Sequence, residues 1–148
     1  MTTRIDVTLM VNGERVSRSV DTRLHLVDFL RSELGLAGAH TGCEHGVCGA
    51  CTVRLDGAVV ETIEGLSDSG EIRDLQEAFV ARNACQCGYC TPGMLVTAAD
   101  ILTASPQATR EEIREHISGN YCRCTGYQAI VDAVEDVLKA RAAKREAA

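Results

Sequence analysis

The most informative part of the chain reads Gly42-Cys43-Glu44-His45-Gly46-Val47-Cys48-Gly49-Ala50-Cys51-Thr52. Four residues separate Cys43 from Cys48, and two separate Cys48 from Cys51. This C-x4-C-x2-C spacing is typical of a loop that wraps three thiolates around one side of a [2Fe–2S] cluster. The glycines between the cysteines can adopt backbone angles that side chains disfavour, so that successive N–H groups can turn towards the sulfurs of an anionic cluster. The loop therefore predicts an iron–sulfur site.

Composition limits the kinds of fold and partner. The 148 residues are enough for one ordinary domain or two small ones, and 45% of them are hydrophobic but only 3% aromatic. Two small cores held together by metal suit these values better than one large core. The net charge of −6 argues against binding to nucleic acid or to an anionic membrane surface.

The N-terminal residues lack the basic region and apolar run of a signal peptide, and no apolar segment is long enough to span a bilayer. We therefore expect a cytoplasmic protein without direct membrane insertion. In that compartment, eight cysteines indicate metal ligands rather than disulfides. Zinc is the main competitor, but the pairs Cys48/Cys51 and Cys87/Cys90 lie farther apart than in a zinc ribbon. A Rieske centre needs two histidines, and only His45, expected to be solvated, lies in a cysteine loop.

The first part of the chain predicts two strands and a helix. Residues 4–20 alternate apolar and polar side chains around Asn12-Gly13, a strong signal for a two-residue hairpin turn. Between residues 26 and 34 the apolar side chains change to helical spacing, and Gly35 follows as a C-cap. These elements precede the cysteine loop and would form a small α+β unit with it.

A second hairpin is predicted for residues 52–60, turning at Asp56-Gly57. The following segment, Glu61–Gly70, is acidic and rich in glycine and serine, which is typical of a linker. We place the domain boundary there, with one domain over residues 1–64 and the other over residues 65–148.

The second domain is predicted to be a small helical bundle. Thr91-Pro92 is expected to begin one helix as N-cap and first helical residue, and Thr109 with Glu112 forms a capping-box pattern before another. The tail from Lys139 onward has no apolar stripe and is expected to fray. The four predicted helices cover residues 72–82, 91–105, 109–117 and 126–138.

The remaining cysteine motifs lie between these helices. Cys87 and Cys90 form a CxxC motif just before the second helix, and Cys122 and Cys124 form a CxC motif between the third and the fourth. The two loops are expected to meet at one end of the bundle and to place four thiolates around a second metal site. A CxxC motif alone is common, whereas its combination with a CxC motif, each at a helix junction, is a much more specific signal for such a metal site.

Three motifs together resemble a known family, the small iron–sulfur subunits of xanthine oxidase-type molybdenum hydroxylases. This family includes carbon monoxide, aldehyde, CoA-thioester and N-heterocycle dehydrogenases. The resemblance implies an α+β fold, with an N-terminal β-grasp domain like that of plant-type ferredoxins followed by an all-α four-helix-bundle domain, and one [2Fe–2S] cluster in each. The motifs are the loop 42–52, Gln86-Cys-Gly-Tyr-Cys-Thr-Pro-Gly-Met94 and Gly119-Asn-Tyr-Cys-Arg-Cys-Thr-Gly-Tyr127.

The resemblance also implies partners and site residues. A large partner subunit would hold molybdopterin, usually as the cytosine dinucleotide, and a medium subunit would hold FAD, in a dimer of heterotrimers. Gln86 and Cys124 would lie beside the pterin. The cluster nearest to molybdenum would be held by Cys87, Cys90, Cys122 and Cys124, and the ferredoxin-like cluster by Cys43, Cys48, Cys51 and a fourth ligand.

That fourth ligand is where this chain departs from the family pattern, which has a cysteine on a strand shortly after the second hairpin. Here Val60 leads directly into a segment that resembles a later point of the pattern. Three explanations stay open. A stretch containing the cysteine has dropped out of the sequence; or the cluster is absent or uses another residue such as Asp56 or Glu61; or Cys85 reaches across. By default we expect Cys85 to be a small buried residue near the second cluster.

The chain offers no nucleophile–base pair and no motif of paired carboxylates, so it is not expected to make or break the substrate's bonds. Thiolate-held clusters exchange single electrons, and electron transfer is therefore the predicted function. A free-standing ferredoxin-like carrier or iron–sulfur sensor is the alternative, and a structural zinc protein is a third hypothesis. The helical half argues against a simple carrier, which needs no second cluster domain.

Overall fold

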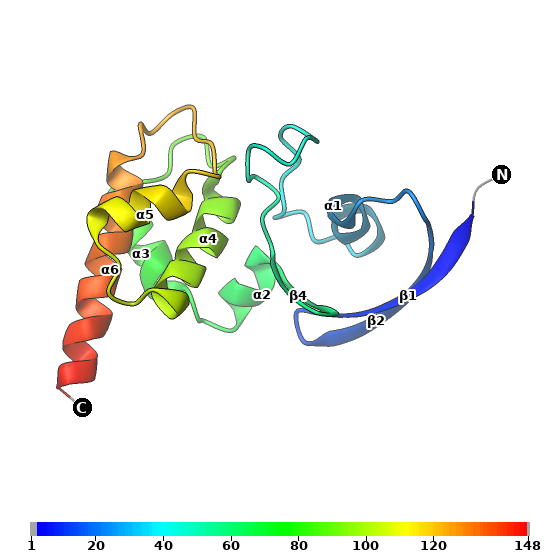
Figure 1. Ribbon diagram of the computed structural model, residues 1–148, viewed down its shortest axis with the longest axis horizontal. Helices are drawn as coiled ribbons and strands as arrows, with labels where there is room; N and C mark the ends of the chain where they lie inside the picture. The colour runs from blue at the N-terminus through cyan, green and yellow to red at the C-terminus, as the bar shows by residue number, and fades with distance from the viewer. Residues whose placement is uncertain (1–2, 148) are drawn as a thin grey trace.

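The computed structural model describes residues 3–147. A unit built on a β-sheet lies at one end of the long axis and a helical unit at the other, with the cysteine loop between them (Figure 1). Strand β1 (Arg4–Val11) pairs antiparallel with β2 (Glu14–Asp21), as predicted. Asn12 and Gly13 both have positive φ, 50° and 82°, which is the type I′ geometry that matches the twist of the two strands.

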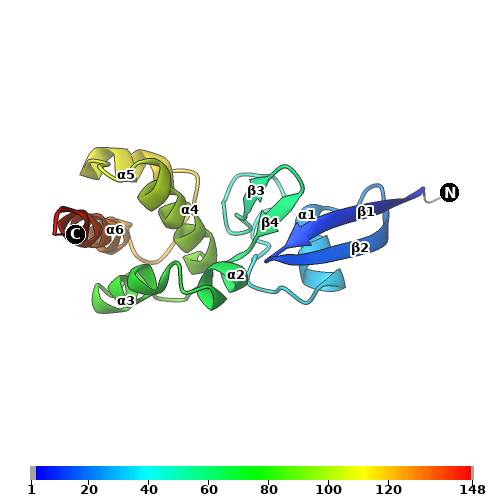
Figure 2. The same ribbon diagram turned by 90° about the horizontal axis from the view of Figure 1, so that it is seen from below.

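The second hairpin is formed by β3 (Arg54–Asp56) and β4 (Val59–Glu61), with Asp56 opposite Val59. The predicted turn at Asp56-Gly57 is therefore wrong by one residue, since Gly57 and Ala58 form the loop and Asp56 ends the strand. β4 also pairs in parallel with β1, which gives the strand order β2-β1-β4-β3 (Figure 2). Because of this parallel pairing, β4 lies in the middle of the sheet, and β3, which follows the cysteine loop, lies at its edge.

One short helical segment covers this sheet. It begins as α1 (Leu26–Asp28) and continues as a π-helical turn, η1 (Phe29–Glu33), so the predicted helix is present but wider in its second half. Phe29 and Leu30 are buried in the core of this unit. The N–H of Leu36 donates to the carbonyl of Leu30 at 2.9 Å around Gly35, whose φ is 72°, as expected of a glycine that closes a helix. The buried core is made of Val11, Val20, Phe29, Leu30 and Val60.

The segment interpreted as a linker, Glu61–Gly70, is wrong as predicted, because most of it forms helix α2 (Ile63–Asp68). Leu66 is only 1% exposed and belongs to the core of the helical unit. Asn12 accepts the N–H of Thr62 at 2.8 Å and donates to its hydroxyl at 3.0 Å, which ties the start of α2 to the first hairpin. In α2, Asp68 is exposed and Glu64, Gly65 and Ser67 are only partly buried, which is why the composition suggested a linker.

We expect Leu66→Ala to lower the free energy of unfolding by about 3 kcal/mol, because it leaves a cavity in a closed core. Urea unfolding followed by circular dichroism measures this change. The control is Val80→Ala on α3, where the side chain is 76% exposed and a change within about 0.5 kcal/mol is expected. Equal, small effects of the two substitutions would mean that residues 63–68 behave as a linker after all.

The helical unit contains α2 and four longer helices in the predicted places. They are α3 (Arg73–Ala81), α4 (Thr91–Ala104), α5 (Arg110–Ile117) and α6 (Gln128–Glu146). The capping box of Thr109 and Glu112 is confirmed, with both reciprocal hydrogen bonds present. At α4 the prediction is wrong by one residue: Cys90 is the N-cap and Pro92 the second helical residue.

The C-terminal tail does not fray where predicted, since α6 continues to Glu146. Arg141 explains part of this: its guanidinium lies 2.7 Å from the carboxylate of Asp74 on α3 and donates to the carbonyl of Glu71 at 2.9 Å. Hydrogen bonding to Arg141 lowers the pKa of Asp74. A polar contact with α3 therefore takes the place of the missing apolar stripe. Over residues 3–147, none of the helices has the length and apolarity needed to cross a membrane.

Candidate iron–sulfur sites

The four cysteines predicted for the second cluster lie on two loops at one end of the helical unit. Cys87 and Cys90 precede α4, and Cys122 and Cys124 precede α6. The structure joins them across the loops in two pairs. The thiol of Cys124 donates to the sulfur of Cys87 at 3.5 Å, and the side chains of Cys90 and Cys122 are also hydrogen-bonded. Two pairs of thiolates match the two irons of a [2Fe–2S] cluster.

The pKa values of the paired thiols Cys90 and Cys122 shift in opposite directions. Burial, with the hydrogen bond to Cys122, raises the pKa of Cys90 to about 12. Burial would also raise the pKa of Cys122, but the hydroxyl and N–H of Thr125, at 3.1 and 3.4 Å from its sulfur, outweigh burial and lower it. Thr125 thus supplies two donors to the sulfur of a predicted ligand. Such donors tune the potential of a bound cluster.

Tyr127 fixes the shape of the CxC loop. Its φ of 68° lies in the left-handed region, which turns the chain sharply into α6. Its hydroxyl accepts the N–H of Cys122 at 2.8 Å, so the ring bridges the loop that it ends. A tyrosine held in this strained conformation is typical of a functional loop.

In the N-terminal loop, the predicted turning of N–H groups towards sulfur is present at Cys43. The N–H groups of His45, Val47 and Cys48 point at this sulfur and, together with the thiol of Cys48, lower the pKa of Cys43 to about 6. His45 is exposed, as expected, and its ring donates a hydrogen bond to the carbonyl of Cys43. The structure therefore brings Cys43 and Cys48 together.

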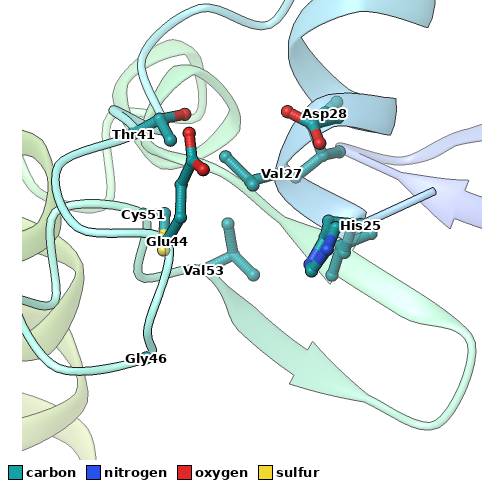
Figure 3. A pocket seen from close by; sticks show the side chains of 10 residues that line it. His25, Val27, Asp28, Thr41, Glu44, Gly46, Cys51 and Val53 are labelled. Carbon is teal, nitrogen blue, oxygen red and sulfur yellow. The ribbon is translucent and has the colours of Figure 1, made fainter. Parts of the chain in front are cut away.

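Cys51, but neither Cys43 nor Cys48, lines a cavity of about 430 Å³ between the cysteine loop and α1 (Figure 3). Thr41, Glu44 and Cys51 lie on one side of it, and His25 and Asp28 on the other. The remaining lining residues are Leu26, Val27, Leu30, Gly46 and Val53. The N-terminal loop thus carries three of the four thiolates that a [2Fe–2S] cluster needs, and one of them lines open space.

None of the three residues considered as a fourth ligand lines this cavity. Glu61 is paired with Arg54 at 2.9 Å, and Asp56 ends β3 at the hairpin loop. Cys85 lies in the helical unit, where the hydroxyl of Thr91 donates to its sulfur at 3.4 Å. The expectation that Cys85 is buried is wrong, since its side chain is exposed on the loop after α3. The fourth ligand therefore stays unassigned.

A second cavity, of about 220 Å³, joins the two predicted sites. Cys48 of the N-terminal loop lines it together with Cys87, Cys90 and Cys122 of the helical unit. Over residues 3–147, no three cysteine, histidine or acidic side chains are arranged to hold a single metal ion; the thiols occur in pairs. The two cysteine loops thus face each other across one small space.

Two contacts between these loops were not predicted from the sequence. Asn120 is buried and bonds to Gly49, and the ring of Tyr89 stacks on His40 with ring centroids 4.7 Å apart. The only sequence signal for Asn120 is its place between Gly119, which follows a predicted helix, and the CxC motif. Gln86 is exposed on the loop before Cys87, and its place beside a pterin stays a prediction.

Comparison with known proteins identifies both halves of the chain. Residues 9–90 match the family model of the 2Fe-2S iron-sulfur cluster binding domain, and residues 62–135 match that of the [2Fe-2S] binding domain. The nicotine 6-hydroxylase small subunit of Paenarthrobacter nicotinovorans is 48% identical, with 90% of this chain and 89% of the relative covered. The caffeine dehydrogenase subunit gamma of Pseudomonas sp. (strain CBB1) is also 48% identical, over 88% of this chain and 89% of its own length.

Among solved structures, the quinoline 2-oxidoreductase from Pseudomonas putida 86 contains a chain with a TM-score of 0.86 and 43% identity, covering 96% of this chain and 97% of that one. The aldehyde oxidoreductase from Desulfovibrio gigas has a TM-score of 0.86 and 37% identity over 95% of this chain and 17% of that chain. The small chain thus corresponds to a whole subunit in the first enzyme and to a part of a longer chain in the second.

The alignments also bear on the fourth ligand. The alignment with the nicotine 6-hydroxylase subunit runs over 148 positions but covers only 90% of the 148 residues of this chain. The relative therefore contains residues that have no counterpart here. With two matching cluster domains and relatives at this level of identity, the chain belongs to the small iron–sulfur subunits of xanthine oxidase-type molybdenum hydroxylases, and its domains bind two [2Fe–2S] clusters for electron transfer.

Proposed function

We propose that this subunit relays single electrons from a molybdenum centre in a large partner chain to a flavin, through the helical cluster and then the ferredoxin-like cluster. The observation that supports a relay between the two clusters is the cavity lined by Cys48, Cys87, Cys90 and Cys122, because residues of both cysteine loops border it. When bound, each cluster accepts and releases one electron. The chain's own residues hold the clusters, donate hydrogen bonds to their thiolates and keep the loops in contact.

The ligands of the helical cluster are proposed to be Cys87, Cys90, Cys122 and Cys124, supported by the two cross-loop thiol pairs. Gln86 and Cys124 are proposed to face the pterin of the partner, since both are exposed at the end of the helical unit. Exposure leaves these two residues accessible to another chain, as contact with a cofactor in a partner requires.

Cys43, Cys48 and Cys51 are proposed as ligands of the ferredoxin-like cluster. Its fourth ligand is proposed to be a cysteine in a stretch that the relatives have and that has dropped out of this sequence, so that the expressed protein carries it. The family pattern places that ligand shortly after Val60, and the cavity beside Cys51 is the open space into which such a segment would fit. The boundary between residues 64 and 65 is proposed to separate the units, supported by a change of core between Val60 and Leu66.

The partners are proposed to be a large chain with molybdopterin cytosine dinucleotide and a medium chain with FAD, assembled as a dimer of heterotrimers in the cytoplasm. Names such as nicotine 6-hydroxylase small subunit and caffeine dehydrogenase subunit gamma support an assembly of unlike subunits. Nicotine, caffeine and quinoline are all nitrogen heterocycles, and these names support a heterocyclic substrate for the whole enzyme.

Iron and acid-labile sulfide, measured on the complex purified with its partners, test this function together with EPR of the reduced sample. We expect both clusters to be filled and to give two distinct signals. A single signal with half of the iron would show that the ferredoxin-like site is empty and that the two-step relay does not operate. A chain that stays monomeric beside its co-expressed partners would instead favour the free-standing carrier.

A further inference from the structure

Asn120 is one of two polar residues in the described chain that are almost fully buried, at 5% exposed. It lies between the end of α5 and the CxC motif, two residues before Cys122. Burying an amide costs free energy unless its donors and acceptor are paired. Its partners therefore indicate what the side chain does.

Those partners belong to both units. The side-chain amide of Asn120 donates to the carbonyl of Gly49 at 3.0 Å and to the hydroxyl of Thr52 at 3.3 Å, both in the N-terminal cysteine loop. Its carbonyl oxygen accepts the hydroxyl of Thr97 on α4 at 2.9 Å. Next to it, the N–H of Tyr121 donates to the carbonyl of Cys48 at 2.7 Å. The residues Asn120, Gly49, Thr52 and Thr97 are called the Asn120 bridge below.

Glycines allow the two backbones to approach this closely. A Cβ on Gly93 of α4 would lie 2.2 Å from the carbonyl oxygen of Gly49, and a Cβ on Gly49 would lie 2.5 Å from that of Gly119. Real Cβ atoms do not approach so closely, so only glycine fits at these positions. The Asn120 bridge therefore sits in a backbone-to-backbone contact with little room for movement.

The Asn120 bridge connects directly to ligands on both sides. Gly49 lies between Cys48 and Cys51, and Asn120 precedes Cys122. A second contact involves Tyr89, which lines the cavity shared by the two cysteine loops and whose hydroxyl donates to the carbonyl of Thr41 at 2.8 Å. Electron tunnelling slows exponentially as two centres move apart, so small movements of one loop against the other alter its rate.

We propose that Asn120 is a positioning residue that fixes the separation of the two clusters by joining their cysteine loops. The inference rests on the proposed ligand assignment, because only then do both loops hold clusters. Asn120 itself touches no reacting atom. It acts through Gly49 and Thr52 on one side and through the backbone of Tyr121 on the other.

The test compares Asn120→Ala with the wild type in the complete complex. In the fully reduced wild type, we expect the two EPR signals to show magnetic coupling. In Asn120→Ala this splitting shrinks, both signals and the iron content persist, and electron transfer between the clusters after flash reduction slows roughly tenfold or more. Amide hydrogen exchange over residues 42–52 rises roughly tenfold, while exchange in the core of α6 is unchanged.

Two further variants keep the test decisive. Thr52→Val removes one partner of the Asn120 bridge without changing the shape of the side chain, and it is expected to act in the same direction as Asn120→Ala. It replaces Asn120→Ala in the test if that variant does not fold. Thr52→Ser keeps the hydroxyl and is expected to retain the wild-type splitting. Thr109→Ala is the control, because its capping box lies within the helical unit and contacts no residue of the other loop.

The outcomes separate the positioning role from the proposed function. If the wild-type complex gives only one EPR signal, the two-cluster relay is contradicted, and the positioning role of Asn120 is contradicted with it. Two wild-type signals whose splitting and loop exchange are the same in Asn120→Ala overturn the positioning role alone. A loss of protection spread equally over α6 and the loop, as from a purely structural defect, overturns it as well.

Discussion

Cys90→Ser is expected to halve the iron content of the complex and to remove one of its two EPR signals. Serine is a poor iron ligand, and Cys90 is half-buried and hydrogen-bonded to Cys122, which is half-buried as well. Loss of an outer partner of a metal site alone costs roughly 10- to 100-fold in affinity or activity. We therefore expect electron delivery to the final acceptor to fall by more than about a hundredfold, while the substrate still reduces the partner's molybdenum centre.

The matched control for this prediction is Cys85→Ser. Cys85 lies two residues before Cys87, but its sulfur contacts the hydroxyl of Thr91 and no other cysteine of the described chain is bonded to it. Its replacement is expected to leave iron content, both signals and turnover unchanged. If Cys85→Ser removed a signal and Cys90→Ser did not, the proposed ligand set would be wrong.

Gly93→Ala is expected to lower the free energy of unfolding by about 3 kcal/mol and to loosen the contact between the two units. The added Cβ would lie 2.2 Å from the carbonyl oxygen of Gly49, which is backbone and cannot rotate away as a flexible side chain could. Either the loop moves away from α4 or the helix distorts. Urea unfolding measures the loss of stability, and hydrogen exchange over residues 42–52 reports which of the two parts has moved.

Gly119→Ala provides the control within the same contact. Its added Cβ would meet nothing within 4 Å, and its φ is not in the left-handed region. A change of less than about 0.5 kcal/mol is expected. Were Gly93→Ala equally harmless, the close approach of α4 and the N-terminal cysteine loop could not exist in solution.

Local patterns predicted most of the secondary structure correctly. The Asn12-Gly13 turn, the glycine after residue 34 and the Thr109–Glu112 capping box each depend on residues that are neighbours in sequence. Such signals act within a few residues, so the chain alone specifies them. Apart from shifts of one residue at the Asp56-Gly57 turn and at the start of α4, the wrong predictions of secondary structure concern Glu61–Gly70 and the tail after Lys139. There, contacts with distant residues make a helix of a segment whose composition does not favour one.

The spacing of the cysteines determined the chemistry of the protein, because C-x4-C-x2-C, CxxC and CxC each set how many thiolates one loop can offer to iron. The tertiary structure decided which thiols meet, Cys87 with Cys124 and Cys90 with Cys122. It also decided how the two loops touch. Asn120 and Gly49 are 71 positions apart, and no periodicity or turn signal links residues at such a distance. Only packing of α4 and α5 against the N-terminal loop brings them within hydrogen-bonding distance.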